Sequence, residues 1–295
     1  MGDLKRAAFI ILSYNSAAYI EACLESVSGL TCVEPRVYLC DNGSSDESVS
    51  VIKNFASNCK RGEGFLTLLE KPQNEGTTKP RNELIQLSFA SEKRFDYIVV
   101  LDSDTVISDD AMSKLFGALD SDASLSLVAP RMFNDSNVEQ MSVKRFPSFA
   151  IKFLKALPID ALSKKGAALE KYDFFPANFF VDAIEDSKLP ICSDENIYVA
   201  DYAISACWVM RACDIARFGY LDEYYFYAPE DVDYCANIMR AHGKVALVSN
   251  ASIYHLTQRI SKRKLFSKMN FLHIKGLLYF ARKHRKTIRA SRKRK

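Results

Sequence analysis

The chain has 295 residues, of which 48% are hydrophobic and 26% charged, and this composition excludes a wholly disordered, collagen-like or coiled-coil protein. Its apolar runs are far shorter than the roughly 20 residues of a membrane-spanning helix, and we expect no signal peptide at its first residues. The net charge of +4 is unevenly placed, because residues 1–233 carry all 36 acidic residues and a formal charge of −13, whereas residues 234–295 carry 17 Lys or Arg and no Asp or Glu.

The first half of the chain alternates short β-rich runs with helical patterns. The runs predict strands at 8–13, 36–40, 65–69, 97–101 and 125–129, with helices between them near 17–28, 46–56, 80–90 and 109–119. Such alternation predicts an α/β fold with βαβ units and a mostly parallel central sheet flanked by helices. Sheets of this kind bind their ligands beyond the carboxyl ends of the strands.

The second half is less regular. Residues 131–200 contain four prolines and no clear alternation, so we expect loops and short helices that cover the sheet. A strand-like run at 198–210, a helix near 231–242 and a strand near 244–249 follow. The eight cysteines form no Cys-x-x-Cys pair, which favours reduced, buried thiols over a zinc site or a disulfide framework.

Polar clusters follow three of the predicted strands, at residues 13–16, 41–46 and 102–104. Asn, Asp, Ser and Gly also form turns and helix caps, so each cluster alone fits turn chemistry. The third cluster, Asp102-Ser103-Asp104, places two carboxylates on one side of the chain. Carboxylate oxygens are suitable ligands for Mg²⁺ or Mn²⁺, and His255 could complete such a site.

Two adjacent carboxylates, Glu230 and Asp231, begin the helix predicted near 231–242. The helix dipole favours acidic residues at this position, so they fit a purely structural role. A carboxylate there could also act as a general base that takes a proton from a sugar hydroxyl.

Six sequence motifs occur in order along residues 7–280: FIILSYNS, VYLCDNGSSDES, NEGTTKPRN, VVLDSDT, FGYLDEYYFYAPEDVDYC and an isolated histidine. Together they resemble the ordered motifs of family 2 glycosyltransferases, and the C-terminal portion is most similar to the bacterial rhamnosyltransferase-like members. The resemblance implies a GT-A nucleotide-binding fold and the transfer, with inversion, of a sugar from a nucleoside diphosphate donor.

The resemblance also implies roles for the residues that match the family motifs. The donor would be bound by Ser13, Tyr14, Asn15, Asp41, Asn42, Gly43, Asn74, Gly76, Arg81, Asp102 and Ser103. Asp41 would lie against the base or its ribose, and Arg81 near the base and diphosphate. The chain departs from the family pattern at 77–80, where Thr-Thr-Lys-Pro replaces a run of small residues, and we expect Lys79 and Pro80 to alter how this loop meets the donor.

The same resemblance implies the metal site and the base. Asp104, Asp102 and His255 would bind Mn²⁺ or Mg²⁺. Asp231 matches the catalytic base, and Glu230 is its main competitor for that role. Asp231 would deprotonate the acceptor hydroxyl during attack, and the metal and Arg81 would stabilise the departing diphosphate.

The basic C-terminal region can be drawn as an amphipathic helix at 264–282. Its apolar face would contain Leu265, Met269, Leu272, Gly276 and Tyr279, beside a basic stripe of Lys264, Lys268, Lys275 and Arg282. Such a helix could pack on the catalytic domain, or lie on an anionic inner membrane leaflet. Residues 281–295 show no core-forming pattern, so we expect them to be loose. No nucleic-acid-binding motif accompanies the basic residues, so no nucleic-acid partner is expected.

These patterns divide the chain into a GT-A domain at 1–258 and a basic helix and tail at 259–295. Within the domain, the nucleotide-sugar half would span about 1–130 and the acceptor half about 131–258. The leading hypothesis is an inverting glycosyltransferase that adds a sugar, with rhamnose as one candidate, to a glycan or lipid-linked acceptor in cell-surface polysaccharide synthesis. It would be cytoplasmic, on the inner face of the cell membrane. The alternatives are a nucleotidyltransferase on a related fold and a non-catalytic membrane-binding module.

Overall fold

The structure is a computed structural model that describes residues 4–146, 196–256 and 268–292; in the last range, side chains are described for 271–288. A central sheet contains the strands β1 (Arg6–Ser13), β2 (Glu34–Asp41), β3 (Leu66–Glu70), β4 (Tyr97–Asp102), β5 (Thr105–Val106), β6 (Leu125–Phe133), β7 (Glu139–Gln140), β9 (Ile197–Ala200), β11 (Cys207–Arg211) and β12 (Lys244–His255). The short strands β8 (Val143–Lys144) and β10 (Tyr202–Ala203) form a separate pair.

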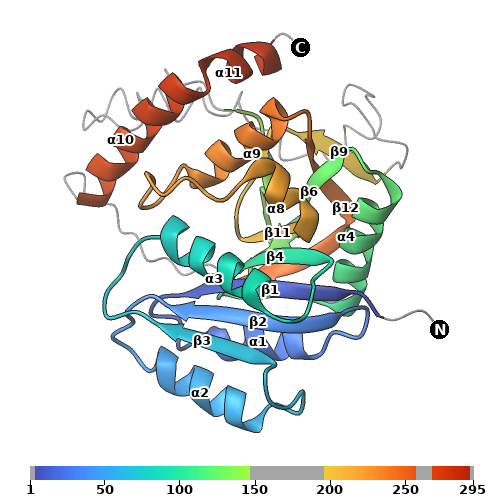
Figure 1. Ribbon diagram of the computed structural model, residues 1–295, viewed down its shortest axis with the longest axis vertical. Helices are drawn as coiled ribbons and strands as arrows, with labels where there is room; N and C mark the ends of the chain where they lie inside the picture. The colour runs from blue at the N-terminus through green and yellow to red at the C-terminus, as the bar shows by residue number, and fades with distance from the viewer. Residues whose placement is uncertain (1–3, 147–195, 257–267, 293–295) are drawn as a thin grey trace.

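The central sheet has the strand order β3-β2-β1-β4-β11-β6-β12-β5, with β7 beside β6 and β9 beside β12 (Figure 1). The first four strands are parallel, as the sequence predicts. Strand β11 runs antiparallel to both β4 and β6, and β6 and β12 are again parallel. The carboxyl ends of β1, β2 and β4 therefore meet at one edge of the sheet.

Helices cover both faces of this sheet. They are α1 (Ile20–Ser28), α2 (Ser48–Asn58), α3 (Thr78–Ala90), α4 (Asp109–Ser121), α8 (Ala212–Phe218), α9 (Glu230–Arg240), α10 (Lys268–Lys283) and α11 (Arg285–Arg292). Apolar side chains of α1, α2 and α4 pack with Phe9 and Ile11 of β1, and those of α3, α8 and α9 pack with Ala8 and Ile10. Successive strand residues thus enter opposite cores, as expected for a parallel sheet buried on both faces.

The strands and helices predicted in the first half are confirmed to within a few residues. The single strand predicted at 198–210 is wrong, because the chain there forms β9, β10 and β11. These strands have different partners: β9 pairs with β12, β10 with β8, and β11 with β4 and β6. The chain must therefore turn twice within this run. The strand predicted at 244–249 continues to His255, past an irregularity between Val248 and Ser252.

The C-terminal helix is confirmed as α10, and its predicted apolar face is confirmed in part. Gly276 is buried and Leu272 and Tyr279 are half-buried, as predicted, but Leu277 and Phe280, which were not predicted, are the most buried large side chains of the helix. Outside this face, Phe271 and Leu278 are 69% and 57% exposed. Residues Lys264 and Leu265 and the side chains of Lys268 and Met269 lie outside the described part of the chain. No helix among the described residues is both long and apolar enough to cross a membrane.

The loose tail predicted at 281–295 is wrong as far as residue 292, because α10 continues to Lys283 and α11 follows it. The structural reason is a second buried stripe, since His284 and Ile288 are 1% and 3% exposed. Figure 1 shows α10 and α11 lying across the top of the molecule, beyond α9. The prolines at 147–190 and Cys192 lie outside the described residues, and the seven described cysteines are free thiols.

Candidate functional site

Three predicted site residues end neighbouring parallel strands. In the register of the sheet, Ser13 of β1 lies beside Asp41 of β2, and Leu12 lies beside Asp102 of β4. Ser13 is fully buried, and its hydroxyl has no hydrogen-bond partner within the described ranges. The prediction that these polar residues lie at one edge of the sheet is therefore confirmed.

The loops after β1 and β2 are joined by hydrogen bonds of the predicted residues themselves. Asn15, in the left-handed region at φ 50°, accepts from the Ser45 amide at 2.8 Å, and its own amide donates to Ser44 Oγ at 2.8 Å. Both oxygens of Asp41 accept from Ser44, at 2.9 Å from its amide and 2.6 Å from its hydroxyl. Tyr14 is half-buried beside them. The turn chemistry that the sequence left open is thus present at Asn15 and Asp41.

The loop after β3 is held against the loop after β2. Asn42 is 2% exposed and donates to the Gly76 carbonyl at 2.8 Å and to Asn74 Oδ1 at 3.2 Å. A Cβ on Gly43, whose φ is 75°, would lie only 2.6 Å from Gln73 Cα. Glycine is therefore required where these two loops approach each other.

The unusual Thr-Thr-Lys-Pro run begins α3 and contacts the chain that precedes α9. The Thr77 amide donates to the Phe226 carbonyl at 2.8 Å, and the Thr78 hydroxyl donates to the Tyr225 carbonyl at 2.5 Å. Lys79 instead forms an exposed ion pair with Glu75 at 3.0 Å. Its effect on the donor stays a prediction.

Arg81 joins the two acidic motifs. Its side chain is 3% exposed; Nη2 donates to Asp102 Oδ1 at 2.7 Å, and Nη1 lies 3.5 Å from Glu230 Oε1. Nη1 also donates to Ser205 Oγ at 3.1 Å. A single buried guanidinium therefore balances one carboxylate from β4 and one from α9, although these strands and helices are far apart in the sequence.

The two carboxylates that begin α9 have different surroundings. Glu230 is 5% exposed, and its Oε2 has no hydrogen-bond partner among the described residues. Burial raises the pKa of Glu230 to about 7; the charge of Asp231 adds to this rise and Arg81 opposes it. Asp231 is only half-buried. Of the pair, Asp231 is thus the more exposed carboxylate.

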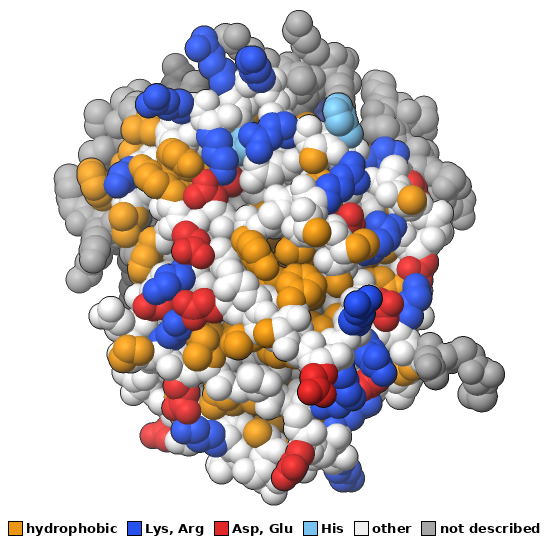
Figure 2. Space-filling model, viewed as in Figure 1, with side chains coloured by type: hydrophobic (Ala, Val, Ile, Leu, Met, Phe, Trp, Pro, Cys, Tyr) orange, Lys and Arg blue, Asp and Glu red, His pale blue; other side chains and the backbone are white. Residues whose placement is uncertain are grey.

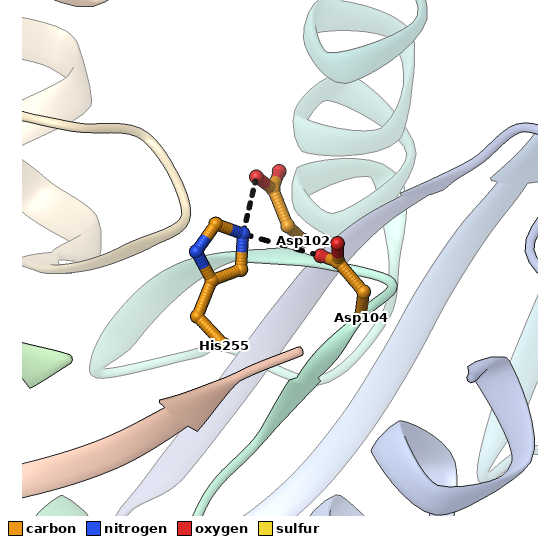
Figure 3. Close-up of side chains that lie close together, drawn as sticks. All are labelled: Asp102, Asp104 and His255. Atoms are coloured by element: carbon orange, nitrogen blue, oxygen red, sulfur yellow. Dashed lines mark ion pairs between the residues drawn. The ribbon is translucent and has the colours of Figure 1, made fainter. Parts of the chain in front are cut away.

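Asp102, Asp104 and His255 form a candidate metal-binding group. One ligand atom from each residue lies within 4.8 Å of the others. His255 Nε2 is 3.4 Å from Asp104 Oδ1 and 4.0 Å from Asp102 Oδ2, as Figure 3 shows. Pairing of β5 with β12 brings the histidine there, because it places His255 beside Thr105, directly after Asp104. Ser103 lies between the carboxylates, with its hydroxyl 2.8 Å from that of Ser16.

Gln140 orients the imidazole of His255. Its Oε1 lies 2.8 Å from His255 Nδ1, and its amide nitrogen donates to the His255 carbonyl at 3.2 Å. Because Gln140 Oε1 can only accept, Nδ1 donates a hydrogen bond to it, and in the neutral ring the lone pair on Nε2 would be available to a metal ion held by the carboxylates. Burial would lower the pKa of His255, but Asp104 and Asp102 hold it above its ordinary value. The pair of carboxylates therefore favours a positive charge at this position.

Sequence reasoning missed Ser205 and Gln140. Ser205 lies in the run that was read as one strand, and Gln140 in the segment that showed no regular pattern. Neither residue type is distinctive by itself. Only the contacts with Arg81 and His255 identify them.

Comparison with known proteins identifies the family. The sequence profile "Glycosyl transferase family 2" matches residues 8–182. The poly-β-1,6-N-acetyl-D-glucosamine synthases of Staphylococcus epidermidis and Staphylococcus aureus are 28% identical over 133 residues and 25% identical over 138 residues. These matches cover 44% and 46% of this chain and 30% and 31% of the two synthases, so the chain spans about a third of their length.

Solved structures with a similar fold are glycosyltransferases. GalNAc-T7 with UDP, GalNAc and Mn²⁺ has a TM-score of 0.64 at 12% identity and covers 96% of this chain and 48% of its own. The mannosyltransferase PcManGT of Pyrobaculum calidifontis, with GDP-Man and Mn²⁺, has a TM-score of 0.58 at 14% identity, and the match covers 98% of this chain and 74% of PcManGT. TarS of S. aureus with UDP-GlcNAc has a TM-score of 0.52 at 15% identity, with coverages of 89% and 61%. The fold is thus of the GT-A type, and the chain belongs to glycosyltransferase family 2.

Proposed function

We propose that this protein transfers a sugar from a nucleoside diphosphate donor to a hydroxyl of a glycan or lipid-linked acceptor, with inversion at the anomeric carbon. One observation carries the proposal: Arg81 contacts Asp102, a member of the candidate metal group, and also Glu230, the neighbour of Asp231. A site for the diphosphate and a site for the base are therefore parts of one connected arrangement.

Asp231 is the base in this proposal. Its carboxylate takes the proton of the acceptor hydroxyl while that oxygen bonds to the anomeric carbon, and the bond from this carbon to the diphosphate oxygen breaks. A single displacement of this kind inverts the anomeric centre. Glu230 is less suited to the role, because it is buried and oriented toward Arg81. Its role is to hold Arg81 in place.

The donor set of two carboxylates and one imidazole fits Mn²⁺, and the carboxylates also suit Mg²⁺. When bound by Asp104, Asp102 and His255, such an ion would neutralise charge on the leaving diphosphate. The structures of GalNAc-T7 and PcManGT were both solved with Mn²⁺, which supports this assignment. The donor pocket would be formed by Ser13, Tyr14, Asn15, Asp41, Asn42, Gly43, Asn74, Gly76, Arg81 and Ser103.

The relatives narrow the choice of donor and acceptor. The staphylococcal synthases are named for a polymer of N-acetylglucosamine, and TarS was solved with UDP-GlcNAc. We therefore place UDP-GlcNAc first among the donors to test, and the rhamnosyl donor that the sequence suggested stays an untested alternative. Synthesis of a cell-surface polysaccharide is the corresponding biological role.

Peripheral attachment to the inner face of the cell membrane is part of the proposal. Phe271 and Leu278 are exposed on α10, and Lys275 and Arg282 lie at helical spacing between and beyond them. Figure 2 shows basic side chains and a group of hydrophobic side chains on the upper part of the molecule, where α10 and α11 lie. Sedimentation with vesicles tests this attachment. We expect the protein to bind anionic but not neutral vesicles, and Phe271→Ser to weaken that binding. Recovery of the same amount of protein in the supernatant with both kinds of vesicle would refute the attachment.

Calorimetric titration with UDP, dTDP and GDP, each with and without Mn²⁺, tests the function. We expect one nucleotide to bind in the presence of Mn²⁺. Asp104→Asn should weaken that binding by more than roughly 10-fold, because loss of a residue that only supports a metal ligand already costs about that much. Asp110→Asn makes the same change at an exposed position on α4 and should bind normally. Asp231→Asn should bind the nucleotide but not transfer the sugar. Absence of binding to all three nucleotides in folded protein would refute the proposal. Unchanged sugar transfer in Asp231→Asn would show that Asp231 is not the base.

A further inference from the structure

A buried polar cluster joins the C-terminal helices to α9. Asp233, in the first turn of α9, is 1% exposed and accepts hydrogen bonds from Tyr225 Oη at 2.9 Å, His284 Nε2 at 2.8 Å and Lys283 Nζ at 2.8 Å. His284 is itself 1% exposed, and its Nδ1 has no partner among the described residues. Within the described structure, the imidazole of His284 therefore forms its hydrogen bond to Asp233 alone.

Lys283 extends the cluster to a second carboxylate. Its Nζ donates to Asp222 Oδ2 at 2.6 Å, and Tyr279 Oη donates to the same oxygen at 3.0 Å. Burial would raise the pKa of Asp222, but the hydrogen bond from Lys283 holds it below its ordinary value. Asp222 and Asp233 lie on either side of the segment 223–232, which contains Glu230 and Asp231. The cluster thus fixes both ends of the segment that carries the proposed base.

The same segment is enclosed between α10 and α3. A Cβ on Gly276 of α10 would lie 3.1 Å from Pro229 Cδ and 3.3 Å from the Ala228 carbonyl oxygen, so the helix backbone approaches closely there. The Tyr279 ring stacks on Tyr224 at a centroid distance of 4.0 Å. On the other side, the start of α3 donates hydrogen bonds to the carbonyls of residues 225 and 226. Both sides restrict how the segment can move.

We propose that α10 and α11 are a positioning element for the sugar transfer, in which Lys283 and His284 act through Asp222 and Asp233 to hold Asp231 in its working geometry. Attachment of a helix by apolar contacts would need no buried charges, and burying an ion pair carries a desolvation cost. Hydrogen bonds between buried charged groups, however, favour a single arrangement of the groups that they join. Asp231 lies two residues before Asp233, so a shift of the first turn of α9 moves both. This inference rests on the proposed function.

The test compares three variants with the wild-type protein. His284→Ala removes the donor to Asp233, and His284→Gln retains an amide donor of similar reach. Ile52→Ala is the control for stability, because Ile52 is fully buried on α2, on the opposite face of the sheet. The first measurement is kcat and KM for hydrolysis of UDP-GlcNAc, followed as UDP release in the presence of Mn²⁺ with water as acceptor. The others are UDP affinity by calorimetry and hydrogen exchange of the 222–231 amides.

We expect His284→Ala to lower kcat by about 10- to 100-fold, the size of effect that a misplacement of about 1 Å has on a reacting group. UDP affinity should stay within about two-fold of wild type, hydrogen exchange at 222–231 should increase, and His284→Gln should recover most of kcat. Ile52→Ala should lose thermal stability without these changes. Unchanged kcat in folded His284→Ala, an equal loss in Ile52→Ala, or unchanged exchange at 222–231 would each overturn the inference. If the wild-type protein neither binds UDP nor releases it from UDP-GlcNAc, that result counts against the proposed function with this donor and not against the positioning role. The exchange measurement would still decide whether His284 positions the segment.

Discussion

We expect the buried carboxyl group of Glu230 to make the stability of the protein fall as the pH rises. Its carboxyl is 5% exposed, and burial raises its pKa from the ordinary 4.5 to about 7, with Asp231 adding to the rise and Arg81 opposing it. In the unfolded chain the same group titrates near 4.5. Between these two values the folded protein therefore binds more protons than the unfolded one, and the free energy of unfolding falls as the pH rises.

The size of this effect follows from the two pKa values. One pKa unit corresponds to about 1.4 kcal/mol, so the ionised Glu230 costs about 3 kcal/mol above pH 7 and almost nothing below pH 4.5. Glu230→Gln removes the ionisation while keeping a polar group beside Arg81. We expect the stability of the variant relative to wild type to increase by roughly 2–3 kcal/mol between pH 5 and pH 8.

Urea unfolding of both proteins at pH 5, 6, 7 and 8, with EDTA present to exclude metal binding, measures this difference. Glu92→Gln is the control, because Glu92 is exposed and the chemical change is the same. Its stability relative to wild type should not depend on pH. A constant difference between Glu230→Gln and wild type from pH 5 to pH 8 would refute the argument that burial disfavours the charged form of Glu230.

Three further predictions concern other contacts of the site. Gly76 has a φ of 86°, and a Cβ there would lie 2.2 Å from the Phe226 carbonyl oxygen. Gly76→Ala should therefore lower the free energy of unfolding, measured by urea unfolding, by roughly 2–4 kcal/mol, and a loss below about 1 kcal/mol would contradict this contact. Arg81→Met leaves two carboxylates near each other without their cation and should cost about 3–5 kcal/mol by the same measurement, whereas an unchanged midpoint would show that Arg81 does not balance them. His255→Ala should weaken Mn²⁺ binding in calorimetry by more than about 10-fold, and equal affinity would remove the histidine from the metal group.

The parallel half of the fold could be predicted because its signals are local. Each strand from β1 to β4 is a short apolar run bounded by turn residues, and each helix between them has its own periodic pattern. Parallel strands end at the same edge, so the positions of Ser13, Asp41 and Asp102 followed from the strand assignments alone. The antiparallel strands were harder, because the run at 198–210 has one continuous β-rich composition but three different sets of partners.

The site shows the same division. Asp102 and Asp104 are two residues apart, and the sequence was sufficient to predict that their carboxylates lie close together. The strand alternation used for that prediction does not hold, because β4 ends at Asp102 and a turn at 103–104 places Asp104. That His255 faces them depends on the pairing of β12 with β5, and its tautomer depends on Gln140, which carries no recognisable signal. Arg81 was expected to lie near the donor, but its contact with both Asp102 and Glu230 required α3 and α9 to be placed on the same face of the sheet.

The sequence by itself thus determined the strand and helix order of the first half, the acidic motifs and the basic C-terminal helix, because these depend on propensity and spacing along the chain. Only the tertiary structure decided which face of α10 is buried and that His284 meets Asp233. An amphipathic pattern states that a helix has an apolar face, but the shape and charge of the opposing surface select the face that packs. Here that surface includes the carboxylates Asp222 and Asp233, so Lys283 and His284 face inward and Phe271 and Leu278 face outward.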